Sequence, residues 1–152
     1  MFDDIITNKA LVIPICAWAL AQISKVFVVL VQKKRFDVRY FVISGGMPSS
    51  HSAFVSALAT TVAFIEGLDS VLFGMCVVLA LVVMYDAAGV RQAVGQQAVV
   101  LNRIIKELET RTPPKVLGKE FKELVGHTSF QVLIGGLMGI GTAWLWIYLT
   151  GI

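Results

Sequence analysis

Long apolar segments constrain the fold of this chain more than any other sequence feature. Segments 10–32, 70–90 and 129–152 are each long enough to cross a bilayer core as a helix, which takes about 20 residues. The last has the Gly-rich spacing that lets membrane helices approach closely. Segment 51–67 is shorter and rich in Ala, Ser and Thr, which favours a helix enclosed by the other three, or a re-entrant segment. With 57% hydrophobic and 15% charged residues, we predict an all-α integral membrane bundle of about four transmembrane helices, one domain over residues 1–152.

The basic residues predict how this bundle lies in the membrane. Of the 13 Lys and Arg residues, 11 fall in the two loops that four spans place on one side. They are Lys33, Lys34, Arg35, Arg39, Arg91, Arg103, Lys106, Arg111, Lys115, Lys119 and Lys122. The positive-inside rule therefore places loops 33–50 and 91–128 in the cytoplasm and both termini outside. In the second loop, apolar spacing over 96–110 predicts a cytoplasmic amphipathic helix, on the membrane surface or against the bundle.

A polar motif, "GGMPSSHSA", stands where the second span begins. Gly46 and the glycine before it free the backbone to wrap an anion. Ser49 or Ser50 can cap the first turn of the helix, and His51 lies within that turn. A helix N-terminus presents N–H groups and a partial positive charge, and both favour phosphate. The motif therefore predicts a phosphate site at the cytoplasmic face.

Other charged and titratable residues are predicted at the same level of the bundle. His127 comes just before the fourth span, so both histidines precede or begin outward-running helices. Arg91 follows the third span and is either a phosphate ligand or a surface anchor, whereas Arg39 is more readily interpreted as an anchor. Lys25 lies inside the first span, where it either snorkels to the surface or faces a polar interior. Asp86 is expected to pair with Arg91 or Lys25 because an unpaired carboxylate is costly there.

Three motifs together carry a family resemblance: "GGMPSSHSA", "YDAAGVRQAVGQQA…LN" (85–102) and "LVGHTSFQVLIGGLMGI" (124–140). They resemble the divergent branch of the type-2 phosphatidic acid phosphatase family, also described as acid phosphatase/vanadium-dependent haloperoxidase-related. The resemblance extends over about residues 22–140. It implies a phosphomonoesterase that works at the membrane surface without a metal ion or other cofactor.

The resemblance also implies roles for individual residues. Ser49 and the neighbouring N–H groups would hold phosphate, and Ser50 replaces a glycine of the parent motif. His51 would protonate the leaving alcohol, and His127 would be the nucleophile that attacks phosphorus. Gln131 stands where the parent family has an acid that orients the nucleophile. Its carbonyl can accept the ring N–H, but it supplies no negative charge.

Other parts of the parent pattern have no direct match. Lys25 is the first candidate for the lysine of the missing first motif, and Arg39 is the second. Arg91 can supply the guanidinium of a missing Ser-Arg pair. If the nucleophile borrows a carboxylate, Asp86 is the first candidate and Glu123 the second.

We therefore predict a phosphatase that hydrolyses a lipid phosphate monoester through a phosphohistidine intermediate, at the cytoplasmic face of a bacterial plasma membrane. Its partners are the bilayer and the lipid phosphate, without nucleic acid. Phosphatidylglycerol phosphate, phosphatidic acid and polyprenyl phosphates all fit. The alternative is a non-catalytic lipid-phosphate-binding or scaffold membrane protein that kept the pocket and lost turnover. A haloperoxidase is the least favoured, because those relatives are soluble proteins.

Overall fold

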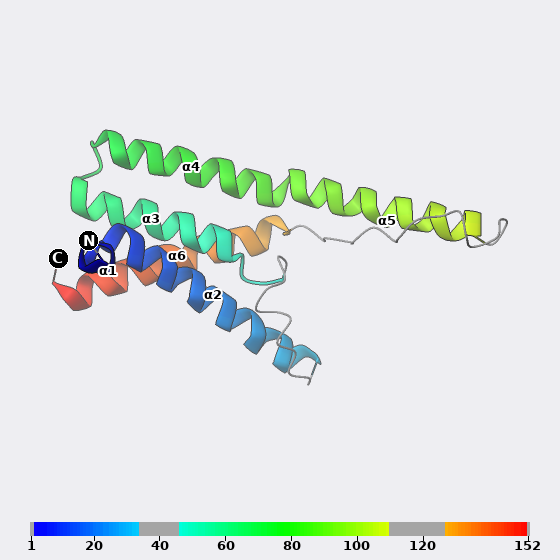
Figure 1. The fold of residues 1–152 in the computed structure, drawn as a ribbon, viewed down its shortest axis with the longest axis horizontal. Coiled ribbons are helices and arrows are strands. Elements are labelled where there is room, and N and C mark those ends of the chain that lie inside the picture. The colour runs from blue at the N-terminus through cyan, green and yellow to red at the C-terminus, as the bar shows by residue number, and fades with distance from the viewer. Residues whose placement is uncertain (1, 34–45, 110–126, 152) are drawn as a thin grey trace.

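All regular structure in the described part of the chain is helical, as the sequence predicts (Figure 1). The computed structural model describes residues 2–33, 46–109 and 127–151. The helices are α1 (Phe2–Thr7), α2 (Lys9–Lys33), α3 (Ser50–Glu66), α4 (Val71–Ala88), α5 (Val90–Glu109) and α6 (Ser129–Thr150). Figure 1 shows the starts of α3 and α6 at one end of the bundle, and α1 with the end of α6 at the other.

Three stretches of helix in the described residues are long and apolar enough to cross a membrane. They are Lys9–Val31 in α2, Val71–Glu107 across α4 and α5, and Ser129–Thr150, which is α6. The first and third coincide with predicted spans, whereas the second contains the predicted span 70–90 and continues to Glu107. The fourth predicted span is α3, whose 17 residues extend only about 26 Å at 1.5 Å per residue. That α3 crosses the bilayer completely stays a prediction.

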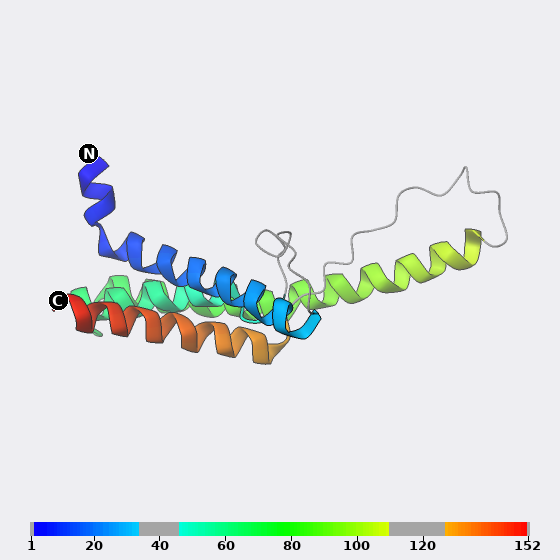
Figure 2. The same ribbon diagram turned by 90° about the horizontal axis from the view of Figure 1, so that it is seen from below.

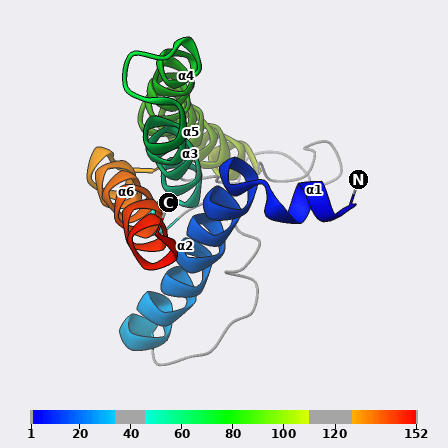
Figure 3. The same ribbon diagram turned by 90° about the vertical axis from the view of Figure 1, so that its left-hand side faces the viewer.

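Helix α3 lies at the centre of the bundle, where it packs against α2, α4 and α6 (Figure 3). Its buried positions carry small side chains, among them Ala53, Ala57 and Thr61. Small residues allow neighbouring helices to approach from several sides, which suits a helix without a wide lipid-facing surface. The prediction of an enclosed second helix is confirmed.

Two glycines of α6 bring this helix into direct contact with the backbone of α3. A methyl group on Gly135 would collide with the Ser49 carbonyl, and one on Gly139 would collide with the carbonyl of Ala53. The backbone N–H of Ser49 also donates to the Gln131 carbonyl over 3.1 Å. Both pairs of contacts advance four residues on each helix, so α3 and α6 run in the same direction with a fixed register.

The amphipathic segment forms a helix, but it does not fold back along the bundle. Helix α5 begins at Val90 and extends the line of α4 away from the other helices (Figures 1 and 2). Among the described helices it contacts only α4. The reason lies at Gly89, whose N–H donates to the Tyr85 carbonyl over 2.8 Å while its own carbonyl accepts from Ala93 over 3.0 Å. Helical hydrogen bonding thus continues through the glycine, and the predicted alternative of packing against the bundle is not seen in the described residues.

Candidate active site

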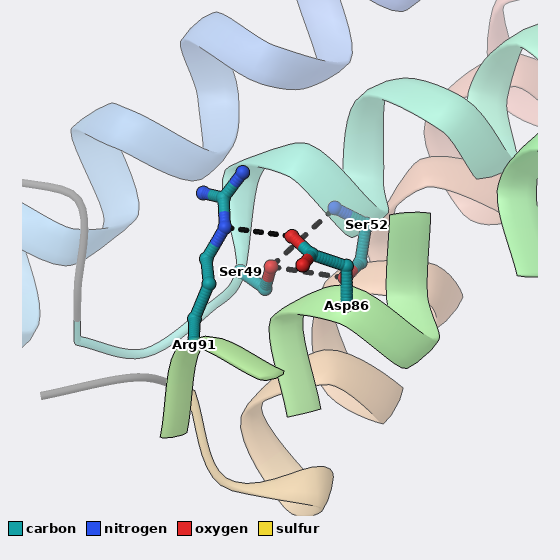
Figure 4. Close-up of polar contacts among 4 residues, drawn as sticks. All are labelled: Ser49, Ser52, Asp86 and Arg91. Carbon is teal, nitrogen blue, oxygen red and sulfur yellow. Dashed lines mark hydrogen bonds and ion pairs between the residues drawn. The ribbon is translucent and has the colours of Figure 1, made fainter. Parts of the chain in front are cut away.

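The loop before α3 leads into a helix N-terminus that is capped by a serine. Gly46 has a φ of +84°, a left-handed conformation that favours glycine. Ser49 is the N-cap, and its fully buried hydroxyl oxygen accepts hydrogen bonds from the backbone N–H of Ser52 over 3.4 Å and the Ser52 hydroxyl over 2.9 Å (Figure 4). Of the two predicted capping serines, Ser49 is therefore the cap. Ser52 is part of this hydroxyl pair, and sequence reasoning did not single it out.

Lys25 points from α2 into the bundle. Only 1% of its surface is exposed, and its Nζ donates to the Ser50 hydroxyl oxygen over 3.2 Å. The snorkelling alternative is therefore wrong. A buried lysine is costly and usually marks a functional site in a membrane protein. Here the cation lies against the first residue of α3, at the helix end that is expected to bind an anion.

Asp86 and Arg91 form an ion pair at the junction of α4 and α5. Arg91 Nε donates to Asp86 Oδ2 over 2.8 Å, so the predicted partner of Asp86 is Arg91 and not Lys25. The ion pair is drawn in Figure 4. Both charges act electrostatically on His51. Because both side chains are partly exposed, the pair itself is worth only about 0.2–1 kcal/mol.

His127 is buried immediately before α6 and is held by Gln131. Its Nδ1 lies 3.2 Å from Gln131 Oε1, and only 3% of its surface is exposed. The same Oε1 accepts the backbone N–H of Thr128 over 3.3 Å, and Thr128 Oγ1 accepts the Gln131 N–H in return, which completes a capping box. Since a backbone N–H can only donate, the side-chain atom that faces it is the oxygen. Nδ1 must then carry the proton, and Nε2 keeps its lone pair.

The surroundings of His127 favour the neutral ring. Burial lowers the pKa of His127 below its usual value of 6.5, the hydrogen bond with Gln131 opposes this shift, and the positive charges of Lys25, His51 and Arg91 lower the pKa further. The described charges that act on this ring are therefore all cationic. A neutral ring with a free Nε2 next to several cations can attack a phosphate ester.

The described residues thus bring together most of the predicted site. Lys25, His51 and Arg91 act on His127, whereas Asp86 acts on His51. Arg39 and Glu123, also proposed from the sequence, lie outside the described residues. Among the described residues, no group of three His, Cys, Asp or Glu side chains is arranged to hold a metal ion.

An apolar groove adjoins the site, and sequence reasoning did not find it. Its lining residues come from α2, α3 and α4 and are Ile15, Trp18, His51, Phe54, Val55 and Val83. The available signal was the spacing of Phe54 and Val55 three and four residues after His51, which places them on one helix face. That signal shows the face of α3 but not what lies opposite.

Comparison with known proteins finds a matching family and a related membrane protein. The sequence matches the family described as "Divergent PAP2 family" over residues 6–142, which include every described residue of the candidate site. The chain is also similar to the "Uncharacterized membrane protein YuiD" of Bacillus subtilis (strain 168), with 40% identity over 146 residues, 90% of this chain and 92% of that protein. No solved structure matches the chain. A family match over this much of the chain, together with helices that are long and apolar enough to cross a membrane, shows that the chain is a membrane protein and belongs to the Divergent PAP2 family.

Proposed function

We propose that the protein hydrolyses a lipid phosphate monoester at the cytoplasmic membrane face, without a metal ion, through a phosphohistidine on His127. The observation that carries this proposal is the arrangement of His127, whose Nδ1 is held by Gln131 while Nε2 is left unprotonated among cations. The family membership supports a phosphatase-related function. The membrane-spanning helices support a substrate that resides in the bilayer.

The reaction proceeds in two displacements. Nε2 of His127 attacks phosphorus, the bond between phosphorus and the ester oxygen breaks, and the departing oxygen takes a proton from His51. Lys25, Arg91 and the N–H groups at the start of α3 stabilise the charge on the three remaining phosphate oxygens. A water molecule then attacks the phosphohistidine and gives its proton to His51. Inorganic phosphate leaves, and both imidazoles return to their starting protonation states.

A non-catalytic lipid-phosphate-binding protein is the second candidate, and one observation favours it. Gln131 gives His127 a hydrogen bond but no negative charge to stabilise the ring as it becomes positive. The same cations and helix N-termini would hold a lipid phosphate without turning it over. The two candidates therefore differ in phosphate release and not in phosphate binding.

The deciding experiment measures phosphate release by the purified protein from a panel of lipid phosphates, with a chelator present. A phosphatase of this kind should form an acid-labile, base-stable phosphoenzyme, and His127→Ala should abolish it. His51→Ala is the matched control among the two histidines. It should still form the phosphoenzyme from a substrate with a good leaving group, because such a group needs no proton donor. Full phosphatase activity in His127→Ala would contradict the proposal.

The cytoplasmic location is proposed from the charge distribution, and cysteine labelling tests it. In a background without Cys16 and Cys76, a single cysteine at Lys115 should label from the cytoplasmic side of the membrane, and one at Leu68 from the opposite side. Leu68 is the better position in the turn between α3 and α4, because it is exposed while Gly67 has a φ of +90° that favours glycine. Labelling of both from one side would mean that α3 is re-entrant.

A further inference from the structure

The apolar groove beside the candidate site has a volume of about 330 Å³. Of its described lining residues, only His51 also belongs to the proposed catalytic machinery. Pockets that bind small ligands range from roughly 300 to 1,000 Å³, so this groove is near the lower end of that range. It is suited to a segment of one hydrocarbon chain.

The groove lies between two helices that do not approach each other. Helix α3 packs against both α2 and α4, whereas the described residues of α2 and α4 have no close backbone contact. Figure 3 shows α2 and α4 on different sides of α3. They form the two walls of the groove, and α3 forms its floor. Because both walls belong to stretches of membrane-spanning length, we expect the groove to open toward the lipid.

The lining residues extend from the site toward the middle of the membrane. On α2, Trp18 and Ile15 precede Lys25 by seven and ten residues, which is about 10 and 15 Å along the helix axis. Lys25 contacts the first residue of α3, next to His51, so it marks the level of the site. An elongated apolar molecule in the groove would therefore have one end at His51 and the other in the bilayer core.

We propose that this groove binds the hydrocarbon chain of a lipid phosphate that enters from the bilayer between α2 and α4. This inference rests on the proposed function, because that function supplies the phosphate end of the ligand. His51 lines the groove at its site end. It is also the proposed proton donor to the ester oxygen that joins the phosphate to its chain, so it links the chain-binding groove to the phosphate site. The occupant is a single chain with the phosphate at its head.

Photocrosslinking of the full chain tests the groove directly. The protein is placed in vesicles with a long-chain alkyl phosphate that carries a diazirine in the middle of its chain, and crosslinked residues are mapped by mass spectrometry. We expect labelling at Trp18 and Phe54, which unlabelled alkyl phosphate suppresses and the corresponding alcohol does not. Val83→Trp fills the groove and should reduce this labelling at least about fivefold, because overpacking opposes entry of the chain.

The residue next to Val83 in the chain provides the matched control for the groove-filling substitution. Val82 is 60% exposed and does not line the groove, so Val82→Trp should leave the labelling unchanged. If Val83→Trp does not fold, Ile15→Trp narrows the groove from the other wall, with the exposed and non-lining Leu11→Trp as its control. Labelling that persists in a folded groove-filling variant would overturn the inference.

The outcome also separates this inference from the proposed function. Groove labelling without a phosphoenzyme would sustain the chain-binding groove and refute the phosphatase. A phosphoenzyme without groove labelling would support the phosphatase and overturn the chain-binding groove.

Discussion

Replacing Gln131 by Glu tests the proposed mechanism most directly. Gln131 Oε1 lies 3.2 Å from His127 Nδ1 and 3.3 Å from the backbone nitrogen of Thr128. Glu is a usual residue at this position of a capping box, and a carboxylate is favourable near a helix N-terminus. The substitution therefore adds a negative charge while it keeps both hydrogen bonds. We expect the free energy of unfolding to change by less than about 0.5 kcal/mol.

The added charge acts on the ring of His127 in two opposing ways. For charge centres about 4 Å apart at an effective dielectric constant of about 20, Coulomb's law gives about 4 kcal/mol of attraction. Because residue 131 is partly exposed, this value is a ceiling. The attraction stabilises the positive ring in the transition state, which corresponds to a gain of up to about 10³ in the rate of phosphoenzyme formation. It also raises the pKa of His127, so more of the nucleophile is protonated near neutral pH.

The assay is rapid-quench measurement of phosphoenzyme formation from neutral to alkaline pH. Gln131→Glu should shift the acid limb of the profile to higher pH and raise the rate on the alkaline plateau. Thr128→Ala is the control, because it removes the hydroxyl that caps the Gln131 N–H but leaves Oε1 in place. It should cost about 1 kcal/mol of stability without moving the profile. If the Gln131→Glu profile superimposes on that of the unchanged protein, residue 131 does not act on the charge of the His127 ring.

Three further predictions concern packing and protonation. Gly139→Ala should destabilise the fold by about 1–3 kcal/mol because the methyl group meets the Ala53 carbonyl, whereas Gly141→Ala, which meets nothing within 4 Å, should be near neutral in the same unfolding assay. Lys25→Met removes a positive charge that lowers the pKa of His127, so this pKa should rise when it is followed by NMR titration of the ring. The pKa of His127 is lower in the folded state than its usual value of 6.5. At pH values between these two pKa values, the unfolded state therefore binds more protons than the folded state. The stability that the neutral ring contributes should be fully present above that usual value and should be lost as pH falls through the folded-state pKa, as unfolding curves at several pH values would show.

Segment length and composition predicted most of the fold. Apolar lengths identified the membrane helices, and small residues identified α3 as the enclosed one. The junction at Gly89 was harder to predict, since a glycine followed by Arg91 is also typical of a helix end at a membrane surface. The outcome depends on whether the glycine adopts helical geometry, and here its neighbours on both sides complete helical hydrogen bonds. The same sequence pattern is compatible with a helix that ends at Gly89 and with one that continues through it.

The candidate site was predictable in its members but not in its geometry. The motifs identified His51, His127 and Gln131, and the spacing of four residues predicted that the last two meet. Whether the Lys25 side chain points to the membrane surface or into the bundle was left open, because the sequence does not give the rotation of α2 relative to α3. The groove was missed for the same reason, since its walls come from two helices whose described residues have no close backbone contact with each other.

The packing of α6 explains why His51 and His127 lie at the same level of the bundle. Gly135 and Gly139 have no side chain to separate α6 from α3, so the two helices are in register where the Ser49 and Ala53 carbonyls fit. This register places the first turn of α3 beside the first turn of α6, and the hydrogen bond from the Ser49 N–H to the Gln131 carbonyl joins them. Gln131, which holds the proposed nucleophile, is thus bound to Ser49, which caps the helix proposed to bind phosphate. A shift of one turn, about 5.4 Å, would break this bond and separate the proposed catalytic groups. The glycines therefore matter for the assembly of the site as well as for the stability of the bundle.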